Sequence, residues 1–233
     1  MRFPDLRRRP LLVSVAALAA IRFSIVYLDR PIARMLVDVP RWLTDLAEWV
    51  TGFGRSDRYL IPLAMAVVVL GLAARYRKDL QGRIAARRWA WTAGFVFLSI
   101  ALSGLLNDVV KLIAGRPRPR IPALDNEPFT FGYDFQSFPS GHAAVAFGLA
   151  LAVGLLWPRW RWPLLVFATA VAASRMILKA HYLGDVMGSA LVAWLTVLWL
   201  SGYLADKGLV FCRGPDGNPV PRVPRNEPPT LSN

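Results

Sequence analysis

The sequence has 233 residues, 55% of them hydrophobic, and this apolar character excludes an ordinary soluble domain in favour of one membrane domain. Its formal net charge is +13, but the basic residues cluster at the ends of apolar runs, which indicates membrane topology and argues against nucleic-acid binding. The single cysteine, Cys212, excludes an internal disulfide and a cysteine-based metal site.

The first segment, residues 1–30, begins with a basic cluster and continues as an apolar run from residue 10 to residue 28. A cleavable signal peptide is the alternative interpretation. However, the run is long enough to cross a bilayer, which needs about 20 residues, and no small-residue cleavage site follows it. We therefore predict an uncleaved first membrane span. Arg22 within it is expected to reach the lipid surface or to face the helix bundle.

The next segment, residues 31–58, mixes tryptophan and phenylalanine with charged side chains. Apolar residues recur at helical spacing between residues 39 and 50, which predicts an amphipathic helix lying in the outer membrane interface. An anchor is the simpler role for this helix. A lid, or a route by which lipid reaches the site, is the alternative.

Five further apolar runs predict a membrane catalytic domain over residues 59–204. The expected spans are residues 59–74, 89–113, 141–157, 163–178 and 185–204. The tail, residues 205–233, is rich in proline and glycine and is expected to be disordered because it has too little apolar surface to fold alone. The predicted fold class is all-α, an integral membrane bundle of six helices.

The distribution of lysine and arginine predicts the orientation of this bundle. With the N-terminus inside, the inner segments hold 16 basic residues, whereas the outer segments hold five besides those of the polar motifs described next. Cytoplasmic segments carry the excess of positive charge, so the motifs would face outward. This predicts a bacterial inner-membrane protein whose site faces the periplasm.

Three polar motifs, residues 111–119, 137–142 and 174–185, lie where apolar runs meet polar chain at the same membrane edge. Both histidines of the protein belong to them. Fixed cations, two imidazoles and a carboxylate gathered at one depth predict a binding site for an anion, with phosphate as the first choice.

In the first motif, Lys111 lies at a helix end and Pro117 and Pro119 stop the helix. Arg116 and Arg118 are equally suited to hold an anion on composition alone. Basic residues that merely mark the membrane interface are the alternative explanation.

In the second motif, Ser140 is a suitable N-cap for the fourth span. The free N–H groups of Gly141 and His142, together with the positive end of the helix dipole, would favour an anion. An ordinary capped helix start with an interfacial histidine is the alternative.

In the third motif, His181 and Asp185 are four residues apart and would share a face of a helix. An aspartate that accepts a hydrogen bond from one ring nitrogen leaves the other nitrogen free to act as a nucleophile or base. A purely structural His–Asp bond is the alternative. A metal ion is not expected, because Lys111, Arg118 and Arg175 would repel it.

These motifs carry a resemblance to a known family. Residues 111–119 match K-x-x-x-x-x-x-R-P, residues 139–142 match P-S-G-H, and residues 174–185 match S-R-x-x-x-x-x-H-x-x-x-D. Together they resemble the signature of the type 2 phosphatidic acid phosphatase superfamily, which includes membrane lipid phosphatases and soluble vanadium haloperoxidases. The resemblance covers about residues 89–204, and the six apolar runs argue against the soluble branch.

The resemblance implies roles for individual residues. It selects Arg118 over Arg116. The phosphate would be bound by Lys111, Arg118 and Arg175, with help from Ser140 and the Gly141 amide. By the same resemblance, His181 is the nucleophile, Asp185 orients it, and His142 protonates the leaving group.

The expected function is that of a membrane phosphatase without metal or other cofactor, which hydrolyses a lipid phosphate monoester or pyrophosphate through a phosphohistidine. Its expected partners are a phosphorylated lipid and the bilayer itself. Undecaprenyl diphosphate is the first substrate candidate, followed by phosphatidylglycerophosphate and a lipid A phosphate. Transfer of the phosphate to another lipid is an alternative that the sequence leaves open.

Overall fold

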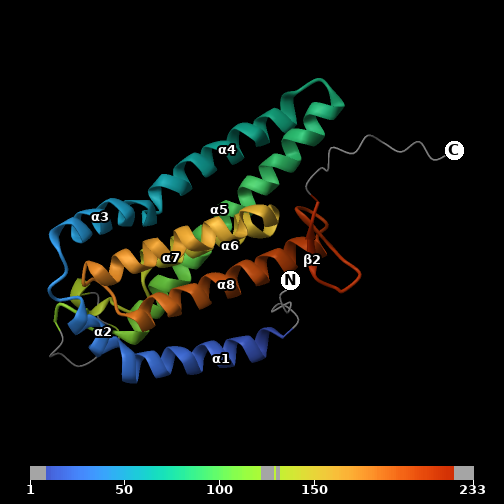
Figure 1. The fold of residues 1–233 in the computed structure, drawn as a ribbon. Coiled ribbons are helices and arrows are strands. Elements are labelled where there is room, and N and C mark those ends of the chain that lie inside the picture. Colours follow the sequence, from blue (N-terminus) through green and yellow to red (C-terminus); the bar gives the residue numbers. More distant parts are fainter. Residues whose placement is uncertain (1–8, 122–128, 130–131, 223–233) are drawn as a thin grey trace.

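The computed structural model is almost entirely helical and describes residues 9–121, 129 and 132–222 (Figure 1). Its six longer helices are α1 (Pro10–Phe23), α4 (Asp57–Tyr76), α5 (Leu80–Ala114), α6 (Gly141–Leu156), α7 (Arg161–Ile177) and α8 (Leu183–Asp206). They correspond to the six predicted spans, and the prediction of an all-α membrane bundle is confirmed.

Shorter elements connect these helices. A π-helix, η2 (Ser24–Leu28), joins α1 to α2 (Asp29–Met35), so the first helical segment continues to residue 35. The other short elements of the described chain are α3 (Arg41–Thr51), η3 (Gly52–Gly54), η4 (Tyr133–Phe135), η5 (Pro158–Trp160), β1 (Phe211–Arg213) and β2 (Pro219–Pro221).

Within the described residues, four stretches are long and apolar enough to cross a membrane: Pro10–Met35, Arg41–Tyr76, Leu80–Ala114 and Leu183–Asp206. Helix α6 is shorter, with 16 residues, and at 1.5 Å per residue it is about 24 Å long. Half of its residues are alanine or glycine, and it packs against α5, α7 and α8. Small residues let membrane helices approach closely: an added Cβ at Gly148 would lie 3.3 Å from the Ser99 carbonyl oxygen of α5.

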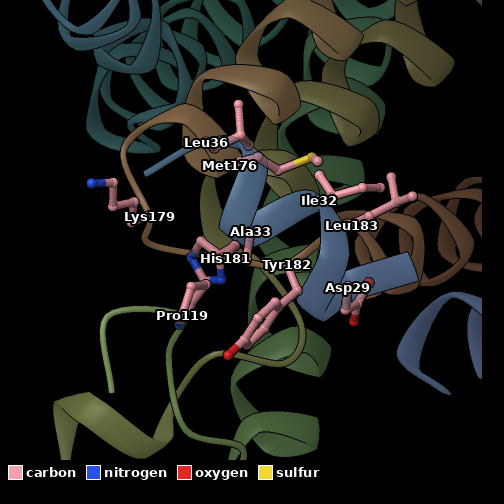
Figure 2. Close-up of a pocket in the computed structure, with 10 residues that line it drawn as sticks. All are labelled: Asp29, Ile32, Ala33, Leu36, Pro119, Met176, Lys179, His181, Tyr182 and Leu183. Atoms are coloured by element: carbon pink, nitrogen blue, oxygen red, sulfur yellow. The ribbon is translucent and has the colours of Figure 1, made fainter. Parts of the chain in front are cut away.

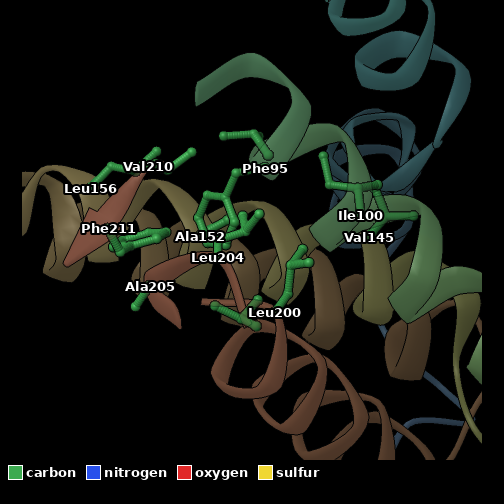
Figure 3. Close-up of a cluster of buried hydrophobic side chains, with 12 residues drawn as sticks. Phe95, Ile100, Val145, Ala152, Leu156, Leu200, Leu204, Ala205, Val210 and Phe211 are labelled. Atoms are coloured by element: carbon green, nitrogen blue, oxygen red, sulfur yellow. The ribbon is translucent and has the colours of Figure 1, made fainter. Parts of the chain in front are cut away.

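The main core joins α5, α6 and α8 to the start of β1, the first strand after α8 (Figure 3). Phe211 of β1 is fully buried, and its ring contacts that of Phe95 edge to face with 4.8 Å between the centroids. The prediction of a disordered tail is therefore wrong for residues 205–222. An apolar anchor, Phe211, lets the antiparallel pair β1–β2 fold onto the bundle, and residues 223–233 lie outside the described chain.

The helix predicted between residues 39 and 50 is present as α3, and it packs against α7. Val50 and Phe53, at the end of α3 and in η3, join a buried cluster with alanines of α6 and α7, whereas Trp42 and Trp49 are exposed. Its position in the membrane interface stays a prediction. Arg22 of α1 is exposed on the outside of the bundle.

The two ends of the bundle differ (Figure 1). One end gathers the start of α1, the α4–α5 turn and the strands after α8. The opposite end gathers α2, the loop after α5 and the start of α8, and it holds the three polar motifs. The motifs and most of the basic connecting segments thus lie at opposite ends.

Candidate active site

Direct contacts join the three motifs at one end of the bundle. Ser137 Oγ, before α6, donates to Asp185 Oδ2 of α8 at 2.5 Å, and Arg118 Nη1, after α5, donates to the Ala180 carbonyl at 3.2 Å. An added Cβ at Gly141 would lie 3.3 Å from Lys111 Nζ, so the ammonium group lies against the start of α6. These contacts bring the three motifs together, and the roles of their residues stay predictions.

His181 lies in the short turn between α7 and α8 and is only 4% exposed. Its Nδ1 is 2.7 Å from the Ser137 carbonyl oxygen, whereas Asp185 Oδ2 is 3.8 Å away. The predicted direct hydrogen bond from His181 to Asp185 is therefore wrong, because His181 precedes α8 and does not share a helical face with Asp185. A carbonyl oxygen only accepts, so Nδ1 carries the proton and the Nε2 lone pair is available for attack on a phosphorus atom.

Asp185 is completely buried in the first turn of α8. Its Oδ2 accepts the Tyr182 N–H at 2.7 Å as well as Ser137 Oγ, and its Oδ1 accepts Arg116 Nη1 at 2.6 Å. Asp185 thus holds Ser137, and the carbonyl of Ser137 holds His181. The aspartate acts on His181 through this intermediate residue and through its charge.

Arg116 and Arg118 have different surroundings. Arg116 is held between two buried carboxylates, Asp185 and Asp29, the latter 2.8 Å from its Nη2, and its guanidinium stacks on the Tyr182 ring. Arg118 donates to three backbone carbonyls, those of Tyr133, Gln136 and Ala180. Since a guanidinium has five N–H groups, two remain on Arg118 for an anion.

Ser140 and Arg175 each present a buried polar atom that has no partner within the described residues, Ser140 Oγ and Arg175 Nε. Ser140 occupies the predicted N-cap position, but its hydroxyl does not cap α6. Arg175, in the last turn of α7, donates through Nη1 to Thr51 Oγ1 at 2.8 Å. Buried polar groups are normally paired, so these two unpaired atoms indicate that a ligand supplies their partner. A hydroxyl and a guanidinium N–H both donate hydrogen bonds, which suits phosphate oxygens.

Lys111 and His142 complete the set predicted from sequence. Lys111, in the last turn of α5, pairs with the exposed Asp108 at 2.8 Å. His142 lies in the first turn of α6 against η3, where an added Cβ at Gly54 would be 2.7 Å from His142 Cβ. The segment before α4 therefore forms one wall around this imidazole.

Burial shifts the pKa values of the site residues that lie in loops. Burial lowers the pKa of His181 below the ordinary 6.5, and the charges of Arg118 and Arg175 act in the same direction while Asp185 opposes them. Burial also lowers the pKa of Arg118. For Arg116, burial alone would lower the pKa, but Asp185 and Asp29 outweigh it and the net shift is upward. At neutral pH this gives a neutral His181 among charged arginines.

Several residues at this site were not predicted from the sequence. Ser137 lies in the second motif, but no role was assigned to it, and Asp29 was hidden at the end of an apolar run. An aspartate at such a position is itself a signal, since buried carboxylates in membrane proteins need partners. Thr51 and Gly54 have no sequence signal. The described residues contain no cluster of three or more His, Cys, Asp or Glu side chains that could hold a metal ion.

Comparison with known proteins gives consistent results. The family model described as PAP2 superfamily matches residues 92–208. The chain is 31% identical over 207 residues to lipid A 1-phosphatase of Rhizobium etli, covering 86% of this chain and 88% of that protein. It is 45% identical over 73 residues to phosphatidylglycerophosphatase B of Escherichia coli, covering 28% of this chain and 29% of that protein.

Among solved structures, a transmembrane PAP2-type phosphatidylglycerolphosphate phosphatase from Bacillus subtilis is similar in fold. The TM-score is 0.58 at 24% sequence identity, and the match covers 87% of this chain and 96% of that one. At this identity the likeness concerns the arrangement of helices.

Proposed function

This chain belongs to the PAP2 superfamily and is a membrane lipid phosphatase, and we propose that it acts through a phosphohistidine formed on His181. The observation that carries this proposal is the pairing of His181 Nδ1 with the Ser137 carbonyl at 2.7 Å. This bond fixes the tautomer in which Nε2 is unprotonated. A neutral, buried and oriented imidazole is what nucleophilic attack on phosphorus requires.

Phosphate binding is supported by donors that the protein leaves available. Of the four buried side-chain polar atoms without a partner in the described chain, two, Ser140 Oγ and Arg175 Nε, belong to the motifs. With Lys111, Arg118 and the Gly141 N–H they offer cations and neutral donors to the three equatorial oxygens of a transferring phosphoryl group. These side chains supply the positive charge themselves, so we propose that hydrolysis needs no metal ion.

In the first step, His181 Nε2 attacks phosphorus and a bond from nitrogen to phosphorus forms while the bond from phosphorus to the lipid oxygen breaks. His142, as imidazolium, gives its proton to the departing oxygen. The bound phosphate dianion favours this charged form of His142. The phosphorylated ring of His181 is a cation, which the negative charge of Asp185 stabilises.

In the second step, the now neutral His142 removes a proton from water, and the water oxygen attacks phosphorus. The bond from Nε2 to phosphorus breaks, and inorganic phosphate leaves. The sum of the two steps is hydrolysis of one phosphate ester or anhydride bond by one water molecule. Replacement of water by the hydroxyl of another lipid would give phosphotransfer in the same site.

For the substrate, we propose the glycosidic phosphate of a lipid A-type glycolipid. The support is the match with lipid A 1-phosphatase of Rhizobium etli, which covers 86% of this chain and 88% of that protein. Undecaprenyl diphosphate, the first choice from the sequence, now ranks behind it. We further propose that the protein resides in a bacterial inner membrane with its site facing the periplasm, as the distribution of basic residues predicts.

The test is phosphate release by the purified protein from lipid A, phosphatidylglycerophosphate and undecaprenyl diphosphate in mixed micelles. We expect lipid A to give the highest kcat/KM and the 1-dephosphorylated product by mass spectrometry. A higher kcat/KM for either other lipid would overturn the substrate assignment. His181→Ala should abolish turnover, and rapid acid-free quenching of the wild type with ³²P-labelled substrate should place acid-labile phosphate on His181. Label on His142 instead would overturn the mechanism.

A further inference from the structure

The buried carboxylate of Asp29 ends a chain of contacts that leads to the nucleophile. Asp29 lies at the start of α2, outside the residues matched by the family model, and its side chain is fully buried. Its Oδ2 accepts Arg116 Nη2 at 2.8 Å, and Arg116 Nη1 reaches Asp185 at 2.6 Å. Through Ser137, Asp185 is in turn connected to His181.

The protein is built to hold Asp29 in this place. Its Oδ1 accepts the Gly184 N–H of α8 and the Ser24 hydroxyl, both at 2.8 Å. An added Cβ at Gly184 would lie 2.9 Å from Asp29 Oδ2, so the carboxylate approaches α8 only because residue 184 is glycine. The π-helix η2 ends directly before Asp29, and such wide turns within helices are frequent at functional sites.

Asp29 and His181 line the same small cavity, together with apolar side chains of α2 and the Tyr182 ring (Figure 2). In this view Asp29 lies at the edge of the cavity nearer to α8, and His181 lies at the opposite edge beside Pro119. The helical segment that continues from the first membrane span therefore lies next to His181, across this small cavity.

We infer that Asp29 is a positioning residue of the phosphatase reaction, which keeps Arg116 from neutralising the negative charge that Asp185 presents to His181. The inference rests on the proposed function, in which His181 becomes a phosphorylated cation. The three groups Asp29, Arg116 and Asp185 carry a net charge of about −1 because two carboxylates flank one guanidinium. Without Asp29, the pair Arg116–Asp185 has no net charge, and the cationic ring loses its counter-charge.

Other charged and titratable groups also face His181. Arg118 lies in the loop after α5, Arg175 in α7 and His142 in α6. Lys179, in the turn after α7, and Tyr182 line the cavity beside it. Most of these groups are cationic and disfavour a charged ring, so the carboxylates behind His181 are the groups that stabilise the phosphorylated form.

The experiment compares the acid limb of the kcat/KM profile in charge-matched variants of the full-length protein. Asp29→Asn should lower kcat roughly 10-fold, which is less than the loss typical when a carboxylate bonded directly to a catalytic histidine is removed. It should also move the acid limb to lower pH by about half to one unit. In the double variant Asp29→Asn with Arg116→Gln, Asp185 alone restores the charge of −1. Its acid limb should return to within about 0.2 units of the wild type.

Two controls separate charge from packing. Ser24→Ala removes a neutral hydrogen bond to the same carboxylate and should leave the acid limb in place. Asp206→Asn breaks the exposed ion pair with Arg213 and should leave kcat and the acid limb unchanged. An acid limb that stays in place in Asp29→Asn, or that shifts equally in Ser24→Ala, would overturn the inference.

If Asp29→Asn does not fold, Arg116→Gln and Arg116→Lys make the same test. Glutamine leaves both carboxylates uncompensated and should move the acid limb upward, whereas lysine keeps the charge and should leave it in place. A downward or absent shift in Arg116→Gln would overturn the inference. ³²P-labelling of His181 in the wild type distinguishes a failure of this inference from a failure of the proposed function. If His181 is labelled but the acid limb does not move in the variants, only the role of Asp29 is wrong. If His181 is not labelled, the proposed function and this inference are both wrong.

Discussion

Replacement of Gly54 by alanine should displace His142 without altering any charged group. The added Cβ would lie 2.7 Å from His142 Cβ, 2.8 Å from His142 Cδ2 and 2.9 Å from Val171 Cγ1. Ordinary contact begins near 3.4 Å, so the two segments must separate by 3.4 − 2.7 = 0.7 Å. The φ of Gly54 is not positive, so alanine introduces no backbone strain and the effect is purely steric.

The expected loss follows from this displacement. Overpacking of this kind costs about 1–3 kcal/mol of stability, and a misplacement of about 1 Å lowers the rate by about 10²-fold. We therefore expect the single-turnover rate constant on the lipid substrate to fall roughly 10- to 100-fold in Gly54→Ala. Since His142 is proposed to protonate the leaving group, p-nitrophenyl phosphate, whose leaving group needs no proton, should lose roughly 3-fold or less in the first turnover.

The assay is single-turnover release of lipid alcohol and of p-nitrophenol by folded, detergent-purified protein, so that hydrolysis of the phosphoenzyme does not enter. Gly71→Ala is the matched control, because nothing lies within 4 Å of the added Cβ. Wild-type rates on both substrates in Gly54→Ala would refute the packing argument. Equal losses on both substrates would refute the proton-donor role of His142.

Three further predictions concern pH, metal ions and orientation. Because burial lowers the pKa of His181, the acid limb of kcat/KM should lie below pH 6.5. The free energy of unfolding should decrease as the pH drops below that value, because the unfolded state then binds one more proton than the folded state. An acid limb above pH 7 in the wild type would contradict this. Activity should survive chelators and be inhibited by orthovanadate, which imitates the trigonal-bipyramidal transition state; loss with chelator that one divalent ion restores would contradict it. A membrane-impermeant maleimide should label Cys212 only after lysis of spheroplasts, whereas a variant with Cys212→Ser and Val37→Cys, at a position 51% exposed, should be labelled before lysis; the reverse pattern would invert the topology.

The membrane spans and the three motifs could be predicted from the sequence because both are local signals. A helix in lipid satisfies its own backbone and must be apolar along its length, so hydropathy along the chain is sufficient to find it. The residues of the motifs have fixed chemistry and fixed spacing. Lys111, Ser140, His142, Arg175, His181 and Asp185 are candidates on these grounds, and the resemblance to the family selects Arg118 over Arg116. The structure brings the motifs that hold them to one end of the bundle.

Only the tertiary structure decided how these residues are held. Arg116 meets Asp185 across 69 residues of sequence and Asp29 across 87, and the acceptor of His181 is a backbone carbonyl 44 residues away. A backbone carbonyl carries no sequence signature, and partners so distant are chosen by helix packing. Phe211 shows the same limit. One aromatic residue hardly changes the composition of a polar tail, so the sequence predicted no folded structure there. In the tertiary structure Phe211 is completely buried among α5, α6 and α8, and this burial holds the two strands against the bundle.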